Sequence, residues 1–174
     1  MSKYSFPQYQ SPLALLSKVG VLTDGKTLDK NDLTLARKAL LAEFDLSQKT
    51  TIRWEGREVS RDDVLKLFDA FQSDNLIEYH NAIQQDEALE RFVARHQVDP
   101  DDSFADNPIY ETDGFKRFIG PYFGAAFAVN LIHLLQKPDF VPAKTLFALP
   151  RLWDEESAQK YWQIIQKVLD EKLA

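Results

Sequence analysis

The sequence predicts a mainly α protein, with one small β-hairpin around residues 50–59 and a buried central helix near 121–136. Apolar residues recur at helical spacing in several segments, which predicts amphipathic helices. A two-residue turn signal between two short β-prone runs predicts the hairpin. The chain has 174 residues, 44% of them hydrophobic, and this suits a core large enough to fold unaided. We therefore expect a compact multi-helix single domain over residues 1–174.

The first clear helix is predicted between Asp29 and Phe44. Asp29 is a good N-cap, because its carboxylate can accept a backbone N–H of the first turn, and Asp32 stands where a capping box needs an acid. Apolar residues then recur with the helical period. They are Leu33, Ala36, Ala39, Leu40 and Phe44.

The hairpin is predicted from the segment that follows. Thr50–Trp54 and Arg57–Val59 are short β-prone runs, and Glu55 and Gly56 between them form a two-residue turn signal. We expect one short β-ribbon here.

A second helix is predicted from Ser60 to Phe71, and its beginning repeats the pattern of the first. Ser60 stands where Asp29 stands, and Asp63 stands where Asp32 stands. An apolar residue precedes each cap, so each helix start has both a capping box and a hydrophobic staple. The shared pattern needs no ligand to explain it.

Residues 73–96 predict one further helix, with a candidate interruption at Gln84–Asp86 before the apolar pattern resumes. Val98–Asn107 is then an acidic loop whose spaced carboxylates resemble a calcium loop. A loop of the EF-hand type that began at Asp99 would need glycine at its sixth position and glutamate at its twelfth, where the chain has Phe104 and Tyr110. We expect a solvated loop, long enough to be a candidate contact surface.

Phe118–Leu135 is the most apolar stretch, with no formally charged residue apart from a possible charge on His133. It just reaches the length of a membrane span, but Pro121, Asn130 and His133 would be costly in lipid and the flanks are not strongly basic. We expect a buried helix that starts near Pro121. A strip of small residues should let another helix approach closely. The strip is Gly120, Gly124 and Ala128.

The last helix is predicted after Asp154, and three prolines keep it separate from the central one. Its apolar face includes Trp162, which we expect in the core, although a terminal amphipathic helix is also a common docking element. The prolines are Pro138, Pro142 and Pro150, and the apolar face is Ala158, Tyr161, Trp162, Ile165, Val168, Leu169 and Leu173.

One nucleotide-binding motif is complete in the sequence. Gly20, Gly25, Lys26 and Thr27 match the P-loop pattern G-x-x-x-x-G-K-T. A P-loop must leave a buried strand and open directly into a helix, whereas Ser11–Val19 reads as a short helix and the next N-cap lies beyond Thr27. The same turn and cap pattern occurs again at Gly56 without the lysine. The sequence therefore favours a helix entrance over a phosphate site.

The sequence contains few candidate catalytic residues. The three histidines, His80, His96 and His133, lie on apolar faces, where a histidine is more often a partly buried, hydrogen-bonded residue than an acid–base group. No metal-ligand spacing or nucleophile elbow occurs. Asn130 and His133, one turn apart, are the one polar pair that we single out, and we interpret it as a buried hydrogen-bonded pair that fixes packing. We expect no catalytic residue, metal or cofactor.

Composition limits the partners further. A formal charge of −6 and interspersed basic residues argue against nucleic acid, and no membrane association is expected. The chain has no cysteine, and its first residues lack an apolar core of signal-peptide length, so the cytoplasm is the expected location.

We expect a non-enzymatic protein that acts through protein–protein interaction, as adaptors, regulators and immunity-type binders do. The alternative is a nucleotide-binding enzyme that uses the loop from Gly20 to Thr27, and a weaker alternative is a binder of a small apolar ligand beside the strip from Gly120 to Ala128. The sequence indicates neither the partner protein nor the oligomeric state.

Overall fold

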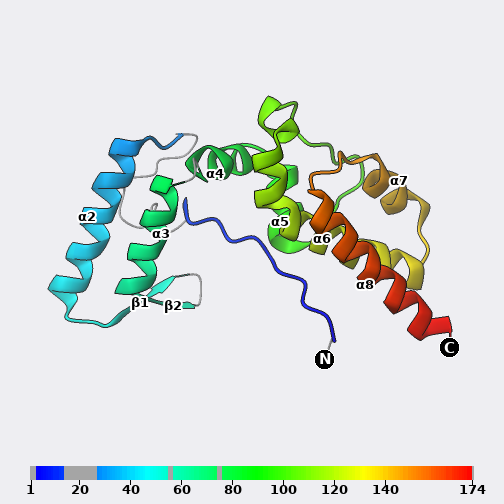
Figure 1. The fold of residues 1–174 in the computed structure, drawn as a ribbon, viewed down its shortest axis with the longest axis horizontal. Helices are drawn as coiled ribbons and strands as arrows, with labels where there is room; N and C mark the ends of the chain where they lie inside the picture. The colour runs from blue at the N-terminus through cyan, green and yellow to red at the C-terminus, as the bar shows by residue number, and fades with distance from the viewer. Residues whose placement is uncertain (1–2, 14–26, 55–56, 74–75, 174) are drawn as a thin grey trace. The chain divides into compact units, whose positions relative to one another are not determined.

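The computed structural model is mainly α, as predicted, and Figure 1 labels its elements. It describes residues 3–13, 27–54, 57–73 and 76–173. Within these residues there are seven α-helices, one 3₁₀ helix and one two-stranded hairpin. In chain order they are α2 (Lys30–Ser47), β1 (Thr51–Trp54), β2 (Arg57–Ser60), α3 (Arg61–Ser73), α4 (Leu76–Gln84), α5 (Glu87–Arg95), η1 (Pro108–Glu111), α6 (Asp113–Gln136), α7 (Phe140–Ala148) and α8 (Glu155–Leu173).

The chain divides into two compact units. The hairpin unit is Ser11–Asn81, and the α6 unit combines Met1–Gln10 with Ala82–Ala174. The division falls inside α4, so the two ends of that helix belong to different units. A single domain over residues 1–174 stays a prediction.

In the hairpin unit, α2 and α3 lie side by side (Figure 1). Their facing side chains form an apolar core, which includes most of the stripe predicted for the first helix. Ala39 is the one member of that stripe that is only half-buried. The buried residues of this core are Leu13, Leu28, Leu33, Ala36, Leu40, Phe44, Val64, Phe68 and Phe71.

Helices α2 and α3 both begin with the predicted capping box. The Asp32 N–H donates to Asp29 Oδ1 at 2.9 Å, and the Asp29 N–H donates back to Asp32 Oδ2 at 3.1 Å. At α3, the Asp63 N–H donates to Ser60 Oγ at 3.2 Å and the Ser60 N–H donates to Asp63 Oδ2 at 3.0 Å. The hydrogen bonds from Ser60 also lower the pKa of Asp63. Each cap is worth about 1 kcal/mol of stability.

The predicted hairpin is confirmed at residues 51–60. β1 and β2 pair antiparallel, with Thr51 opposite Ser60 and Ile52 opposite Val59. Ile52 and Val59 pack against the core of the unit, so one face of the ribbon is covered. The predicted turn residues, Glu55 and Gly56, lie outside the described residues.

α6 is the central helix of its unit, and it begins earlier than the sequence suggested. Thr112 is its N-cap and accepts the Phe115 N–H at 3.3 Å, so Pro121 lies inside the helix rather than at its start. An internal proline costs one backbone hydrogen bond. Complete burial of Phe115 and Ile119 in the preceding turns offsets this cost and keeps the helix continuous.

α8 packs against α6 (Figure 1) along the predicted strip of small residues. A Cβ atom added to Gly120 would lie 2.6 Å from Asp154 Oδ1, and one added to Gly124 would lie 2.7 Å from Cε2 of Tyr161. Real Cβ atoms essentially never approach within 3.0 Å, so a side chain at either position would force its neighbours to shift. At Gly120 these neighbours are the ends of the Asp154 and Ser157 side chains, whereas at Gly124 the obstacle is the buried Tyr161 ring. The expected close approach of another helix at these two glycines is confirmed, and the space beside them is filled by α8.

By length and composition alone, α6 is apolar enough to cross a membrane. Its best window has a mean hydropathy of 1.6, and 56% of that window is buried within the protein. Helices α5, α7 and α8 contact it, as is usual for a helix at the centre of a core.

The segment from Lys3 to Gln10 is part of the α6 unit. The Tyr9 N–H donates to the Val93 carbonyl at 2.9 Å, and the Tyr9 ring packs edge-on against Tyr122 with a centroid separation of 5.7 Å. The Pro7 carbonyl is 3.1 Å from Nε2 of His96. Tyr9 is only 3% exposed, so this segment contributes to the core.

Candidate functional site

The predicted phosphate loop falls mostly where the structure gives no description. Gly20, Gly25 and Lys26 lie outside the described residues, and Thr27 is exposed. The P-loop hypothesis therefore stays a prediction.

Asn130 and His133 do not bond to each other. Asn130 Nδ2 donates to the His96 carbonyl at 2.9 Å and to the Ala126 carbonyl at 2.8 Å. His133 is exposed rather than partly buried, because it lies on the outer side of the last turns of α6. Both residues line one open cleft of about 610 Å³, together with Lys137 and Phe140.

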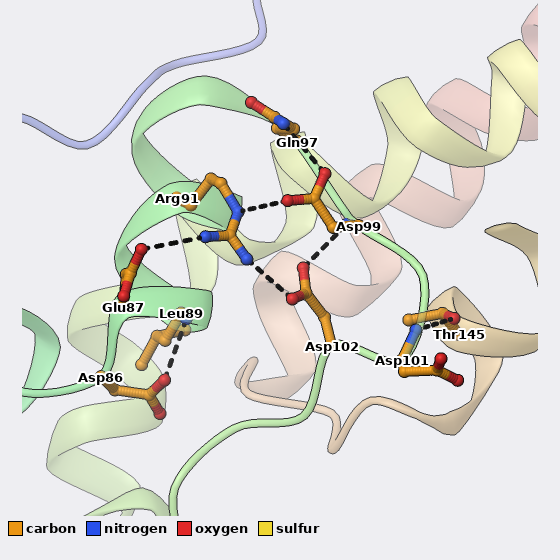
Figure 2. Close-up of polar contacts among 9 residues, drawn as sticks. All are labelled: Asp86, Glu87, Leu89, Arg91, Gln97, Asp99, Asp101, Asp102 and Thr145. Atoms are coloured by element: carbon orange, nitrogen blue, oxygen red, sulfur yellow. Dashed lines mark hydrogen bonds and ion pairs between the residues drawn. The ribbon is translucent and has the colours of Figure 1, made fainter.

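The acidic loop is attached to α5 by an arginine. In Figure 2, the Arg91 guanidinium lies among Glu87, Asp99 and Asp102, and its shortest contact is 2.7 Å from Nη2 to Asp102 Oδ1. The Asp99 N–H donates to the other Asp102 oxygen at 2.7 Å. Hydrogen bonding to Asp102 raises the pKa of Arg91. These carboxylates hold the loop in place.

Asp86 holds the far end of the same loop. This buried residue caps α5 by accepting the Leu89 N–H at 3.1 Å (Figure 2). Its Oδ2 accepts both the Ala105 N–H and the Tyr110 hydroxyl, each at 2.7 Å. Burial is the main cause that raises the pKa of Tyr110, and the hydrogen bond to Asp86 raises this pKa further. All these contacts are structural.

Among the described residues, no group of three His, Asp or Glu side chains is placed to hold a metal ion. His80 is buried and packs edge-on against Phe71 at 5.3 Å, and His96 is half-buried.

The feature that best fits a site is α7, a helix that the sequence analysis did not predict because three prolines mark this region as a connection. Asp139 is its N-cap and accepts the Val141 N–H at 3.1 Å. Pro142 occupies the first turn, where a backbone N–H has no partner within the helix, so it does not disrupt α7. An N-cap followed by a proline in the first turn is the signal that identifies this helix.

Arg151 completes the other end of α7. Leu149 is extended, as expected for a residue before Pro150, so the helix ends here. Arg151 Nη1 then donates to the Leu149 carbonyl at 2.7 Å, and Nη2 reaches the Phe147 carbonyl at 3.4 Å. A cation at these unpaired carbonyls also complements the helix dipole. The short helix is thus fixed at both ends.

One side of α7 is buried and the other is exposed and apolar. Thr145 and Leu146 face the core. The exposed residues of the helix are Phe140, Val141, Lys144, Phe147 and Ala148, and we call the first four of them the α7 face. Phe140 is 80% exposed, Val141 51% and Phe147 52%. Three of the seven exposed large hydrophobic side chains in the described part of the chain lie on these nine residues of helix, so exposed apolar groups gather here.

A buried aromatic cluster supports this face. The Phe127 ring, fully buried in α6, is 6.2 Å from Phe147 and 5.7 Å from Trp162 between ring centroids. The Arg151 guanidinium lies 4.7 Å from the centre of the same ring. Trp162 is 45% exposed, which corrects the expectation that it lies in the core. Tyr161 and Ile165 occupy the inner side of α8, and Trp162 lies at the edge of that contact.

The charges around the α7 face are mainly positive. The helix itself carries Lys144 and no carboxylate, with Lys137 before it and Arg151 after it. The nearest carboxylate in sequence, Asp139, is engaged as the N-cap. Residues 157–169 of α8, which surround the exposed tryptophan, contain two lysines and no carboxylate. Near the α7 face the cations Lys137, Lys144 and Arg151 therefore outnumber the carboxylates Asp139 and Asp101, on a chain whose formal charge is −6.

The arrangement has exposed aromatic groups on a rigid support, a flanking arginine and a neighbouring open cleft. Tryptophan, tyrosine and arginine dominate the binding energy of protein interfaces, and phenylalanine is enriched there. Lys144 is the one ionisable side chain of the α7 face. Comparison with protein-family models, with curated proteins and with solved structures finds no match to this chain.

Proposed function

We propose that this protein acts by binding another protein through the α7 face. The observation that carries the proposal is the exposure of Phe140 and Phe147 on a helix that is fixed at both ends. Exposed aromatic groups are costly in water unless a partner covers them. A preorganised face also loses little conformational freedom on binding.

The aromatic side chains beneath the α7 face support a role for this face in binding another protein. Phe147 and Trp162 both rest on Phe127, and Arg151 covers part of the same ring. Such side chains keep their orientation before the partner arrives. Each is large enough to act as a binding hot spot, for which truncation costs about 2 kcal/mol or more.

Site-specific photo-cross-linking in the native cells tests the proposal. A photoreactive phenylalanine analogue would replace Phe147 and, as the matched control, Leu46, which is 87% exposed on α2. We expect a discrete adduct with another protein from position 147 only. Phe140→Asp should reduce the adduct about tenfold, the effect of losing one hot-spot contact.

The opposite results would contradict the proposal. Equal adducts from positions 147 and 46, or an adduct that Phe140→Asp leaves unchanged, would mean that the α7 face does not select a partner. Turnover of a specific substrate by the purified protein would point to an enzyme instead. A thermal shift with Mg-ATP that Lys26→Ala abolishes would support the nucleotide-binding alternative.

A further inference from the structure

We infer that the partner presents an amphipathic helix whose apolar stripe is flanked by carboxylates. This inference rests on the proposed function, because it specifies which chemistry the α7 face selects. It follows from two features of the face: the spacing of its apolar side chains and the sign of its charges.

The apolar side chains match a partner helix. Phe140 and Phe147 are seven residues apart, which places them on one side of α7 about 10 Å apart along the axis. A second helix laid against α7 presents its own apolar residues at three- and four-residue intervals, which fill the spaces around these two rings. An amphipathic helix docked on an apolar surface is a common mode of peptide recognition.

The charges select an acidic helix. Lys144 lies between the two phenylalanines on the exposed side of α7, and the exposed Lys137 lines the cleft that Phe140 also lines. Arg151 lies at the opposite end of the helix, where its guanidinium is bonded to backbone carbonyls. Two carboxylates lie nearby: Asp139 lines the same cleft and accepts the Val141 N–H, and Asp101 belongs to the loop beside the buried Thr145. The three cations outnumber these two carboxylates, so a partner with flanking carboxylates is favoured over one with flanking lysines.

Lysines and exposed aromatic groups could also contact an anionic lipid surface, so the test includes one. Two fluorescent peptides would be designed with the same leucine stripe, one with glutamate and the other with lysine at the flanking positions. Binding of each to the full chain would be measured by anisotropy at low and at high salt. Sedimentation with phosphatidylcholine vesicles that contain phosphatidylserine would measure lipid binding.

We expect the glutamate peptide to bind at least about tenfold more tightly than the lysine peptide, a difference of about 1.4 kcal/mol. The preference should shrink at high salt, because these charges are exposed to solvent. The double variant Lys137→Glu/Lys144→Glu should lose or reverse the preference for the glutamate peptide. Lys38→Glu, the same charge change at an exposed position on α2, should leave it unchanged.

Equal binding of the two peptides, binding of neither, or a preference that survives the double variant would overturn the inference. If the protein sedimented with the vesicles and also showed no preference for the glutamate peptide, the inference would be overturned in favour of lipid binding. The proposed function fails separately, through the cross-linking result. An adduct from position 147 that Lys137→Glu/Lys144→Glu leaves unchanged would keep the binding function and reject the acidic helix.

Discussion

Replacing Gly124 with alanine tests the packing that organises the α6 unit. The added methyl group would lie 2.7 Å from Cε2 of Tyr161 and 2.9 Å from Cγ, inside the limit that real Cβ atoms respect. Tyr161 is fully buried, so its ring can move only by disturbing packed neighbours or by entering the small cavity of about 180 Å³ that it lines. The strain is relieved by a shift of this ring, by a separation of α6 from α8, or by both.

The magnitude follows from two opposing effects. Overpacking of a core costs about 1–3 kcal/mol, and alanine is favoured over glycine within a helix by about 1 kcal/mol. The obstacle at Gly124 is a buried ring rather than the end of a flexible side chain, so the upper part of the first range applies. We expect Gly124→Ala to lower the free energy of unfolding by about 1–2 kcal/mol.

Urea unfolding followed by circular dichroism would measure this change as a lower midpoint at an unchanged slope. The same substitution in a Tyr161→Ala background supplies the control, because the methyl group then enters a space that the ring has vacated. There we expect no loss or a gain, and hence a coupling between the two positions of about 1 kcal/mol or more. If Gly124→Ala were as stable as the wild type, or equally harmful in both backgrounds, the close approach of α8 at this glycine would be wrong.

Three further substitutions test other parts of the structure by urea unfolding. Tyr161→Phe should leave stability unchanged or raise it by up to about 1 kcal/mol, because the buried hydroxyl has no hydrogen-bond partner among the described residues; a clear loss would show that this hydroxyl is bonded. Asp86→Ala should cost about 3 kcal/mol or more, since two backbone N–H groups and a tyrosine hydroxyl lose their acceptor, and a loss below about 1 kcal/mol would contradict that role. Burial lowers the pKa of His80 to about 4, whereas in the unfolded chain the imidazole titrates near 6.5. The neutral imidazole therefore contributes its full share of the free energy of unfolding above pH 6.5. About 3 kcal/mol of this stability is lost as the pH falls towards 4. His80→Gln should show a smaller loss between pH 7 and pH 4 than the wild type, and equal losses would assign the titration to other groups.

Features that depend on neighbouring residues were predictable from the sequence. The capping boxes at Asp29 and Ser60 need only a residue three positions away, and both are present in the structure. The hairpin at residues 51–60 depends on a short turn between β-prone runs. The close contact at Gly124 was also predicted, because small residues one turn apart permit it whichever helix approaches.

Exposure could not be predicted in the same way. The helical period places Trp162 on the apolar side of α8, yet it does not tell how far α6 extends to cover that side. His133 lies in an apolar run but on the uncovered side of the last turns of α6. The sequence pattern does not predict α7, because a proline in a connecting segment usually indicates the end of a helix, although Pro142 in the first turn is compatible with one.

The early contact between Tyr9 and Val93 has a consequence for how the protein is made. Tyr9 leaves the ribosome long before its backbone partner in α5 has been synthesised, and the whole hairpin unit lies between them in the chain. The hairpin unit is a contiguous insertion, so all of its residues are available to fold while the α6 unit is still incomplete. The α6 unit, by contrast, must close a long loop before Tyr9 reaches its place, and loop closure costs entropy that grows only slowly with length. The segment around Tyr9 is thus synthesised before the hairpin unit, but it can form its native contacts only after α5 has been made.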